Sequence, residues 1–166
     1  MARQANLAVG SVGAMLLSLA TLATPLNVSA APTETPVYFS AGGHLVAEVR
    51  VVESHAPARQ ALKALTAGPA QAGHHSEVPP DVTVLNLAIK GGVATANFGP
   101  ELFSSAGTTG LQLRLGQIVY TLTAFPTVTR VQFLANGQRL EVANGDGFII
   151  DHPLSRRDFK DVAPLA

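Results

Sequence analysis

Cysteine is absent from the 166 residues of this chain. Its absence excludes disulfide frameworks, thiolate zinc sites, cysteine nucleophiles and anchoring through a lipid-modified cysteine. Tryptophan is also absent and there are only two tyrosines. A protein that stacks its ligand on exposed aromatic side chains is therefore disfavoured.

Charged residues are also scarce, at 13% of the chain, and eleven Lys and Arg balance eleven Asp and Glu. Nucleic-acid binding depends on basic side chains that neutralise phosphates, so a net charge of zero without a long basic run argues against it. The hydrophobic fraction of 47% favours a folded chain over a disordered one. The length predicts one domain.

Residues 1–30 have the layout of a secretory signal peptide. Arg3 is their only charged residue, residues 7–23 form an apolar run, and small side chains at 28–30 are typical of a cleavage site. As a helix the apolar run would be about 26 Å long, shorter than the ~30 Å hydrocarbon core of a bilayer. Cleavage after Ala30 is therefore favoured over a retained anchor. We expect export to the periplasm, the extracellular space or the cell wall, with no membrane span after cleavage.

The next segment predicts a short linker and a β-hairpin. Residues 31–36 hold two prolines and two threonines, as an extended linker does. Residues 37–40 are β-prone, residues 41–43 turn the chain, and the alternation over 44–52 predicts the second strand. One apolar face of that strand would carry Leu45, Ala47, Val49 and Val51.

Two helices are predicted from apolar residues spaced three and four apart. The first has Pro57 in its first turn and stops at Gly68-Pro69. Its apolar face is Ala58, Ala61, Leu62 and Leu65. The second starts with a Thr109-x-x-Gln112 capping box and stops at Pro126. Its apolar stripe is Leu111, Leu115, Ile118, Leu122 and Phe125.

The remaining alternating segments predict further strands, joined by Gly91-Gly92 and Asn136-Gly137 hairpin turns. These strands are expected over 82–90, 93–98, 129–134, 138–142 and 148–150. A helical turn is expected over 155–161. Strands that come in hairpins predict a mainly antiparallel sheet. Two helices with one apolar stripe each are expected to cover one face of that sheet. The fold class is therefore α+β, a two-layer sandwich with a mainly antiparallel sheet and two helices on one face.

Several segments, taken in order, resemble the GerMN domain family. The longest runs from Ile118 to Gly137 and reads IVYTLTxFPxVxxVxFxxxG. Shorter matches are VYF at 37–39, LVxExR at 45–50, ALxALxAGP at 61–69, SxVP at 76–79 and PLxRxDF at 153–159. The resemblance delimits a GerMN-like domain over 37–160, followed by a tail over 161–166.

The resemblance implies an exported or lipid-anchored envelope protein, of the kind found in sporulating and other bacteria. It implies a non-catalytic domain whose fold is similar to the ring-building motif of secretion-type assemblies. Family precedent includes roles in sporulation, germination and cell-envelope assembly. This chain carries one copy of the domain instead of a tandem pair, and its mid-loop holds His74-His75.

Few residues suggest chemistry. His74 and His75 are ligand types, but adjacent residues of an extended segment point in opposite directions, which favours a solvated loop over a shared metal. Glu77 and Asp81 could act as an acid–base pair on a wall glycan, or be solvent-facing loop residues. Within the family signature, Tyr120, Thr121 and Thr123 are candidates for an interaction surface.

We therefore predict a non-enzymatic protein with no catalytic residue, cofactor or metal. It would act as a protein–protein interaction or scaffold module, with other envelope proteins or a second copy of itself as partner. The alternatives are a module that binds peptidoglycan and, less favoured, a wall hydrolase that uses Glu77 or Asp81.

Overall fold

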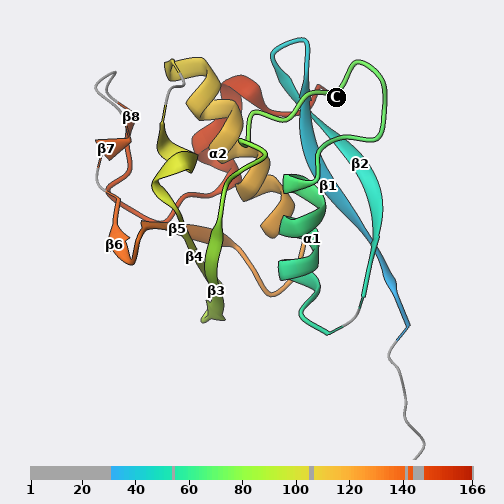
Figure 1. Ribbon diagram of the computed structural model, residues 1–166, viewed down its shortest axis with the longest axis horizontal. Coiled ribbons are helices and arrows are strands. Elements are labelled where there is room, and N and C mark those ends of the chain that lie inside the picture. Colours follow the sequence, from blue (N-terminus) through green and yellow to red (C-terminus); the bar gives the residue numbers. More distant parts are fainter. Residues whose placement is uncertain (1–30, 54, 105–106, 141, 144–147, 166) are drawn as a thin grey trace, which may run out of the picture.

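The computed structural model describes residues 31–53, 55–104, 107–140, 142–143 and 148–165 (Figure 1). The predicted signal peptide lies outside these residues. Among the helices that are described, none has the length and apolar character needed to cross a membrane.

The predicted N-terminal hairpin is present as β1 (Thr33–Ala41) and β2 (His44–Val52), an antiparallel pair. β1 begins at Thr33, so the strand includes most of the segment predicted as a linker. Phe39 lies opposite Val46 in the register. A backbone bridge between Ser40 and His75 occupies the other side of β1, which leaves β2 as the outer strand.

The predicted apolar face of β2 is wrong in part. Leu45 is buried, but Val49 and Val51 are exposed, whereas Glu48 is only 3% exposed. Glu48 lies opposite the fully buried Val37 of β1, so it shares the inward face of the hairpin. A carboxylate can occupy that position because neighbouring donors satisfy it, and sequence alternation cannot reveal those donors.

Helix α1 (Pro57–Thr66) forms as predicted, with Ala58, Ala61, Leu62 and Leu65 buried. Gly68 follows it with a φ of 89°, in the left-handed region that ends many helices. In Figure 1, α1 lies between β3 and the β1–β2 hairpin.

Helix α2 (Thr108–Leu122) is the central element of the fold. The predicted stripe from Leu111 to Leu122 is fully buried, and so is most of the rest of the helix. The reason is that α2 contacts β1 and β2, α1, β5 and the C-terminal η2 at once. The predicted capping box is wrong, because the N-cap is Gly107 and no side chain caps the helix.

The main sheet has four strands in the order β3-β4-β5-β6. β3–β4 and β5–β6 are antiparallel hairpins, whereas β4 and β5 are parallel because α2 connects them. The α+β class is confirmed, but the parallel pair and the separation of the β1–β2 hairpin from the main sheet were not predicted. The strands are β3 (Val84–Lys90), β4 (Val93–Phe98), β5 (Arg130–Ala135) and β6 (Gln138–Arg139).

Short elements complete the chain. β7 (Val142–Ala143) pairs with β8 (Phe148–Ile149), and η1 (Pro100–Phe103) precedes α2. The predicted final helical turn is η2 (Arg156–Val162), which ends with the buried Val162 inside the predicted tail. One face of the main sheet is apolar: Leu87, Ala96 and Phe133 are neighbours across β3, β4 and β5. This face packs against the helices.

Candidate functional site

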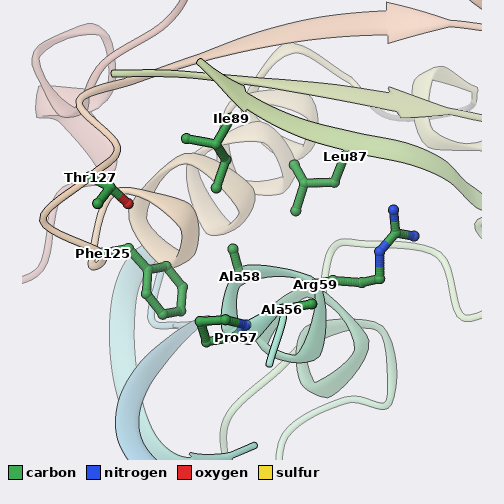
Figure 2. Close-up of a pocket in the computed structure, with 8 residues that line it drawn as sticks. All are labelled: Ala56, Pro57, Ala58, Arg59, Leu87, Ile89, Phe125 and Thr127. Atoms are coloured by element: carbon green, nitrogen blue, oxygen red, sulfur yellow. The ribbon is translucent and has the colours of Figure 1, made fainter. Parts of the chain in front are cut away.

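An apolar groove lies between the N-terminal turn of α1 and the edge strand β3 (Figure 2). Figure 2 shows Leu87 and Ile89 of β3 pointing towards α1, with Phe125 at one end and Arg59 at the other. The groove has a volume of about 270 Å³. It is lined by Ala56, Pro57, Ala58, Arg59, Leu87, Ile89, Phe125 and Thr127.

The sequence builds this groove from three local patterns. Alternation along β3 places Leu87 and Ile89 on one face. Their neighbours on β4 are the small Ala96 and Ala94, so the two larger side chains stand above their surroundings. Phe125 follows α2 immediately before Pro126, and its ring therefore projects from the turn and not from the helix.

The chemistry of the groove is that of apolar contact. Among the described residues, Arg59 is the only charged one that lines it, and none of the lining residues can serve as a general base or as an activated nucleophile. Its volume is below the ~300–1,000 Å³ of typical small-molecule pockets. The groove suits the insertion of a few apolar side chains from a partner.

Glu48 binds the loop after α1 to the β1–β2 hairpin. This loop carries His74, His75, Glu77 and Asp81. Nδ1 of His74 lies 2.9 Å from Glu48 Oε1. Glu48 also accepts hydrogen bonds from the backbone N–H groups of Ala70 and Gln71, each at 3.0 Å.

Burial alone would raise the pKa of Glu48, but its hydrogen-bond donors outweigh that effect. The N–H groups of Ala70 and Gln71, the His74 side chain and the charge of Arg50 together hold the Glu48 pKa below its ordinary value. Arg50 Nη2 lies 2.6 Å from Glu48 Oε2 and also donates to the carbonyl of Gly68. The pair is structural, because it holds the loop after α1 against the hairpin.

The two histidines of this loop have separate surroundings. The His74 side chain faces Glu48, whereas His75 is exposed and bridges Ser40 through its backbone, with both N–H···O distances at 2.8 Å. Among the described residues, no group of three His, Asp or Glu side chains has the placement to hold a metal ion. A metal role for these histidines gains no support from the geometry.

Glu77 and Asp81 are not brought together by any contact in the described part of the chain. The N–H of Glu77 donates to Gln117 Oε1 at 3.0 Å, and its carbonyl accepts from Arg114 Nε at 2.7 Å. Ser40 Oγ donates to its carboxylate at 3.3 Å. Asp81 is exposed. Glu77 is thus fastened to α2, and the hydrolase hypothesis stays a prediction without geometric support.

Tyr120, Thr121 and Thr123 hold β1 and η2 on α2. The Tyr38 N–H donates to Thr121 Oγ1 at 3.0 Å, and the Tyr38 and Tyr120 rings meet edge to face at 5.2 Å. The Arg156 guanidinium lies 4.7 Å from the Tyr120 ring centroid and donates through Nε to Thr123 Oγ1 at 2.8 Å. Burial raises the pKa of Tyr120, an effect that Arg156 partly offsets. These contacts are internal, and the interaction role of the three residues stays a prediction.

A second, polar cleft of about 580 Å³ lies where β5 meets the C-terminal segment. His152 lies 2.5 Å from Asp151 and 3.5 Å from Asp158, and the hydrogen bond with Asp151 is the main cause of its raised pKa. The side chains of Arg130 and Arg157 also line the cleft, and neither forms a hydrogen bond or ion pair with another described residue.

Sequence reasoning missed the groove, the buried Glu48 and the role of Arg156. The groove could not be found because it depends on β3 lying at the sheet edge beside α1. Glu48 and Arg156 did have a signal, since both fall in segments that resemble the family. That resemblance did not show what either side chain contacts.

Comparisons with known proteins agree with this fold. The chain is similar in structure to the tandem GerMN domains of the sporulation protein GerM from Bacillus subtilis, with 29% identity and a TM-score of 0.68. That match covers 77% of this chain and 48% of the tandem structure, so the chain spans about half its length. The first GerMN domain of the same protein matches with 28% identity and a TM-score of 0.65, covering 75% of this chain and 98% of that domain.

A further solved structure shares the fold at 23% identity. It is a Clostridium perfringens protein described as a lipoprotein, with a TM-score of 0.58, and the match covers 80% of this chain and 93% of that one. No match is found among curated proteins. The Germane family model, described as "Sporulation and spore germination", matches residues 36–141, more than half of the chain. The chain therefore belongs to the GerMN family of sporulation and spore germination domains.

Proposed function

We propose that this GerMN chain is an exported, non-catalytic interaction module of the bacterial cell envelope, and that its partner docks in the α1–β3 groove. The groove carries the proposal, because apolar side chains beside a free strand edge are typical of protein-binding surfaces. Ile89 is 42% exposed there although it is a large apolar residue. An exposed apolar strand edge is also a template on which another chain can pair.

Export is part of the same proposal and rests on residues 1–30. Their single basic residue, apolar run and small residues before position 31 support cleavage after Ala30. Mass spectrometry of the chain recovered from the envelope or culture fraction tests this. An N-terminus at Ala31 is expected, and a chain that keeps Met1 or Ala2 would contradict it.

A role in sporulation or germination is the most specific form of the proposal. One similar solved structure belongs to a sporulation protein of Bacillus subtilis, and the matching family is described by sporulation and spore germination. This chain spans about half of the tandem structure, so the described residues correspond to one docking module.

Site-specific photo-crosslinking in the source organism tests the docking proposal. A photoreactive residue at position 89 would lie in the groove, and the same residue at Ala88 would lie on the opposite face of β3. We expect one discrete adduct from position 89 that is absent from position 88, and lost when Leu87→Glu is added. No adduct at position 89, or equal adducts at both positions, would refute docking in the groove.

The polar cleft favours a second candidate function, the binding of peptidoglycan. Its support is the pair of arginines, Arg130 and Arg157, which have no partner among the described side chains and could bind the carboxylates of wall peptides. Co-sedimentation with purified sacculi tests it. Binding that is lost in the Arg130→Ala, Arg157→Ala double variant but kept in Arg59→Ala would support this candidate. Sedimentation unchanged by the double variant would remove it.

A further inference from the structure

The turn between β5 and β6 consists of Asn136 and Gly137. Both residues have backbones in the left-handed region, with φ of 48° at Asn136 and 82° at Gly137. This is the geometry of a type I′ hairpin turn, which the Asn-Gly pair readily adopts. Both residues are exposed, so water reaches them. In Figure 1, β6 lies at the edge of the main sheet opposite β3, and the turn is therefore separate from the α1–β3 groove.

The Asn-Gly pair that favours this turn is also chemically reactive. The backbone nitrogen of Gly137, after losing its proton, attacks Cγ of the Asn136 side chain. A bond forms between that nitrogen and Cγ, which closes a succinimide ring, and the side-chain nitrogen takes up the proton and leaves as ammonia. Water then opens the ring at either carbonyl to give aspartate or isoaspartate. Glycine favours the attack because no Cβ hinders its nitrogen.

The end of β4 holds both backbone N–H groups of the turn. The Asn136 N–H donates to the carbonyl of Phe98 at 3.0 Å. The Gly137 N–H donates to Oδ1 of Asn97 at 2.8 Å. Asn97 is in reach because β4 and β5 run in parallel, with Phe98 level with Ala135 at the start of the turn. The side chain of Asn97 thus engages the nitrogen that would attack Asn136.

This hydrogen bond opposes ring closure in two ways. An acceptor at Gly137 stabilises the protonated nitrogen, so the reactive deprotonated form becomes rarer. The bond also directs the N–H towards β4, whereas the attack requires the nitrogen to turn towards Cγ of Asn136. The contact with Asn97 must therefore open before the ring can form. Because the contact is exposed, local opening can occur without unfolding of the domain.

We infer that Asn136-Gly137 is a site of spontaneous hydrolytic deamidation, and that the Asn97 side chain slows the reaction in the folded chain. Water is the only co-reactant that the reaction requires. Isoaspartate inserts a methylene group into the main chain of the turn. The register of β6, which pairs Ala135 with Gln138, cannot be kept around this longer backbone. The modification therefore releases β6 from the sheet edge.

Peptide mapping of the full chain after incubation in mildly alkaline buffer measures the reaction. Trypsin cleaves after Arg130 and Arg139, and the peptide 131–139 contains Asn136 as its single asparagine. The other Asn-Gly pair, Asn144-Gly145, falls in the next tryptic peptide and is measured separately. Mass spectrometry detects the conversion of the amide to the acid. Chromatography separates the aspartate and isoaspartate forms of the peptide.

Three variants isolate the contribution of Asn97. Asn97→Ala removes the acceptor, whereas Asn97→Asp keeps an acceptor oxygen on a side chain of the same shape. Asn86→Ala is the matched control, because Asn86 is exposed and lies opposite Asn97 on β3. We expect Asn97→Ala to accelerate deamidation at Asn136 about fivefold, the effect of losing one typical hydrogen bond. Asn97→Asp should react no faster than the wild type, and Asn86→Ala should stay within about twofold of it.

Two further measurements separate local protection from global stability. In urea, where the chain is unfolded, the wild type and Asn97→Ala should deamidate at one common rate that exceeds the rate of the folded wild type. Hydrogen exchange followed by NMR should be faster at the Gly137 N–H of Asn97→Ala and unchanged in α2.

Two outcomes would overturn the inference. One is an Asn97→Ala protein that deamidates at the wild-type rate. The other is a folded wild type that reacts as fast as its unfolded chain, because the turn would then give no protection. If Asn97→Ala does not fold, Asn97→Asp provides the test. Its folded form must react more slowly than its unfolded form, and equal rates would contradict the role of the acceptor at position 97.

Discussion

Glu48 and His74 join strand β2 to the loop that follows α1. His74 Nδ1 lies 2.9 Å from the Glu48 carboxylate, which is almost completely buried. A carboxylate can only accept this hydrogen bond, so the proton resides on Nδ1 of His74. With Arg50 and two backbone N–H groups, His74 completes the set of donors that makes a buried charge tolerable. The loop after α1 is thereby fixed to the hairpin.

Replacing Glu48 by glutamine should destabilise the fold by about 2–3 kcal/mol, because Arg50 and two N–H groups lose a charged acceptor in a buried site. Urea unfolding measures this change as a lower midpoint with an unchanged slope. Glu53→Gln is the control, since Glu53 is exposed and its replacement should stay within about 0.5 kcal/mol. Equal midpoints for the two variants would show that the buried pair contributes nothing.

The same carboxylate predicts the acid sensitivity of the fold. The Glu48 pKa in the folded chain lies below its ordinary value of 4.5. A depressed pKa gives stability that is complete above 4.5 and is lost as the pH falls through the lower folded value. The melting temperature of the wild type should therefore fall below pH 4.5, and more steeply than that of Glu48→Gln. Parallel pH profiles for the two proteins would contradict this.

Arg156 and Arg157 are adjacent but should differ strongly in their contribution to stability. Arg156 lies over the rings of Tyr38 and Tyr120 and donates to Thr123 Oγ1 and the Tyr120 carbonyl. Arg156→Ala should cost about 2 kcal/mol through lost ring contacts and hydrogen bonds. Arg157→Ala should change stability by less than about 0.5 kcal/mol.

Thermal unfolding of the two single variants compares them directly. Arg156→Lys adds a second comparison, since a lysine keeps the charge but cannot stack on the rings and donate through a planar fork at once. We expect Arg156→Lys to recover only a minor part of the loss. Full recovery would show that charge alone fixes η2 to α2.

The helices and their buried faces could be predicted because their signal is local. Ala58, Leu62 and Leu65 follow one helical repeat, and the Leu111–Leu122 stripe follows another. The strands were also predicted, but the face of a strand that becomes buried was not predicted where strand pairing determines it. Val49 and Val51 alternate like core residues, yet the hairpin turns Glu48 inward and leaves the two valines outside.

The groove could not be predicted for a related reason. Leu87, Ile89 and Phe125 each belong to a recognisable pattern, but their common cleft depends on β3 being an edge strand beside α1. That placement follows from the parallel pairing of β4 with β5. Pairing between strands separated by a whole helix leaves no trace in local periodicity.

Gly68 provides a test of the stop after α1. Its φ of 89° lies in the left-handed region, and a Cβ added there would meet nothing within 4 Å. The cost of Gly68→Ala is therefore backbone strain alone, about 1 kcal/mol. Gly68→Asn is the matched comparison, because asparagine tolerates the left-handed region better than alanine does, and it should lose clearly less stability. Chemical unfolding distinguishes the two, and equal stabilities would refute the strained conformation.

At Gly116, α2 packs tightly against Leu45 of β2 and Phe159 of η2. A Cβ at this position would lie 3.2 Å from Leu45 Cδ1 and 3.3 Å from Phe159 Cδ1. An alanine adds one methyl group, which these side chains can accommodate by moving a few tenths of an ångström. The substitution also gains about 1 kcal/mol of helix propensity. Gly116→Ala should therefore remain near the wild-type stability.

Gly116→Val adds two further methyl groups at the same point. They must displace Leu45 or Phe159 and separate α2 from the hairpin or from η2, at a cost of about 1–3 kcal/mol. Thr109→Val introduces the same branched side chain in the exposed first turn of α2, where no such neighbour lies, and should change stability by less than about 0.5 kcal/mol. Thermal unfolding should place Gly116→Val lowest of the three variants. A Gly116→Val protein as stable as Thr109→Val would mean that α2 does not approach the hairpin this closely.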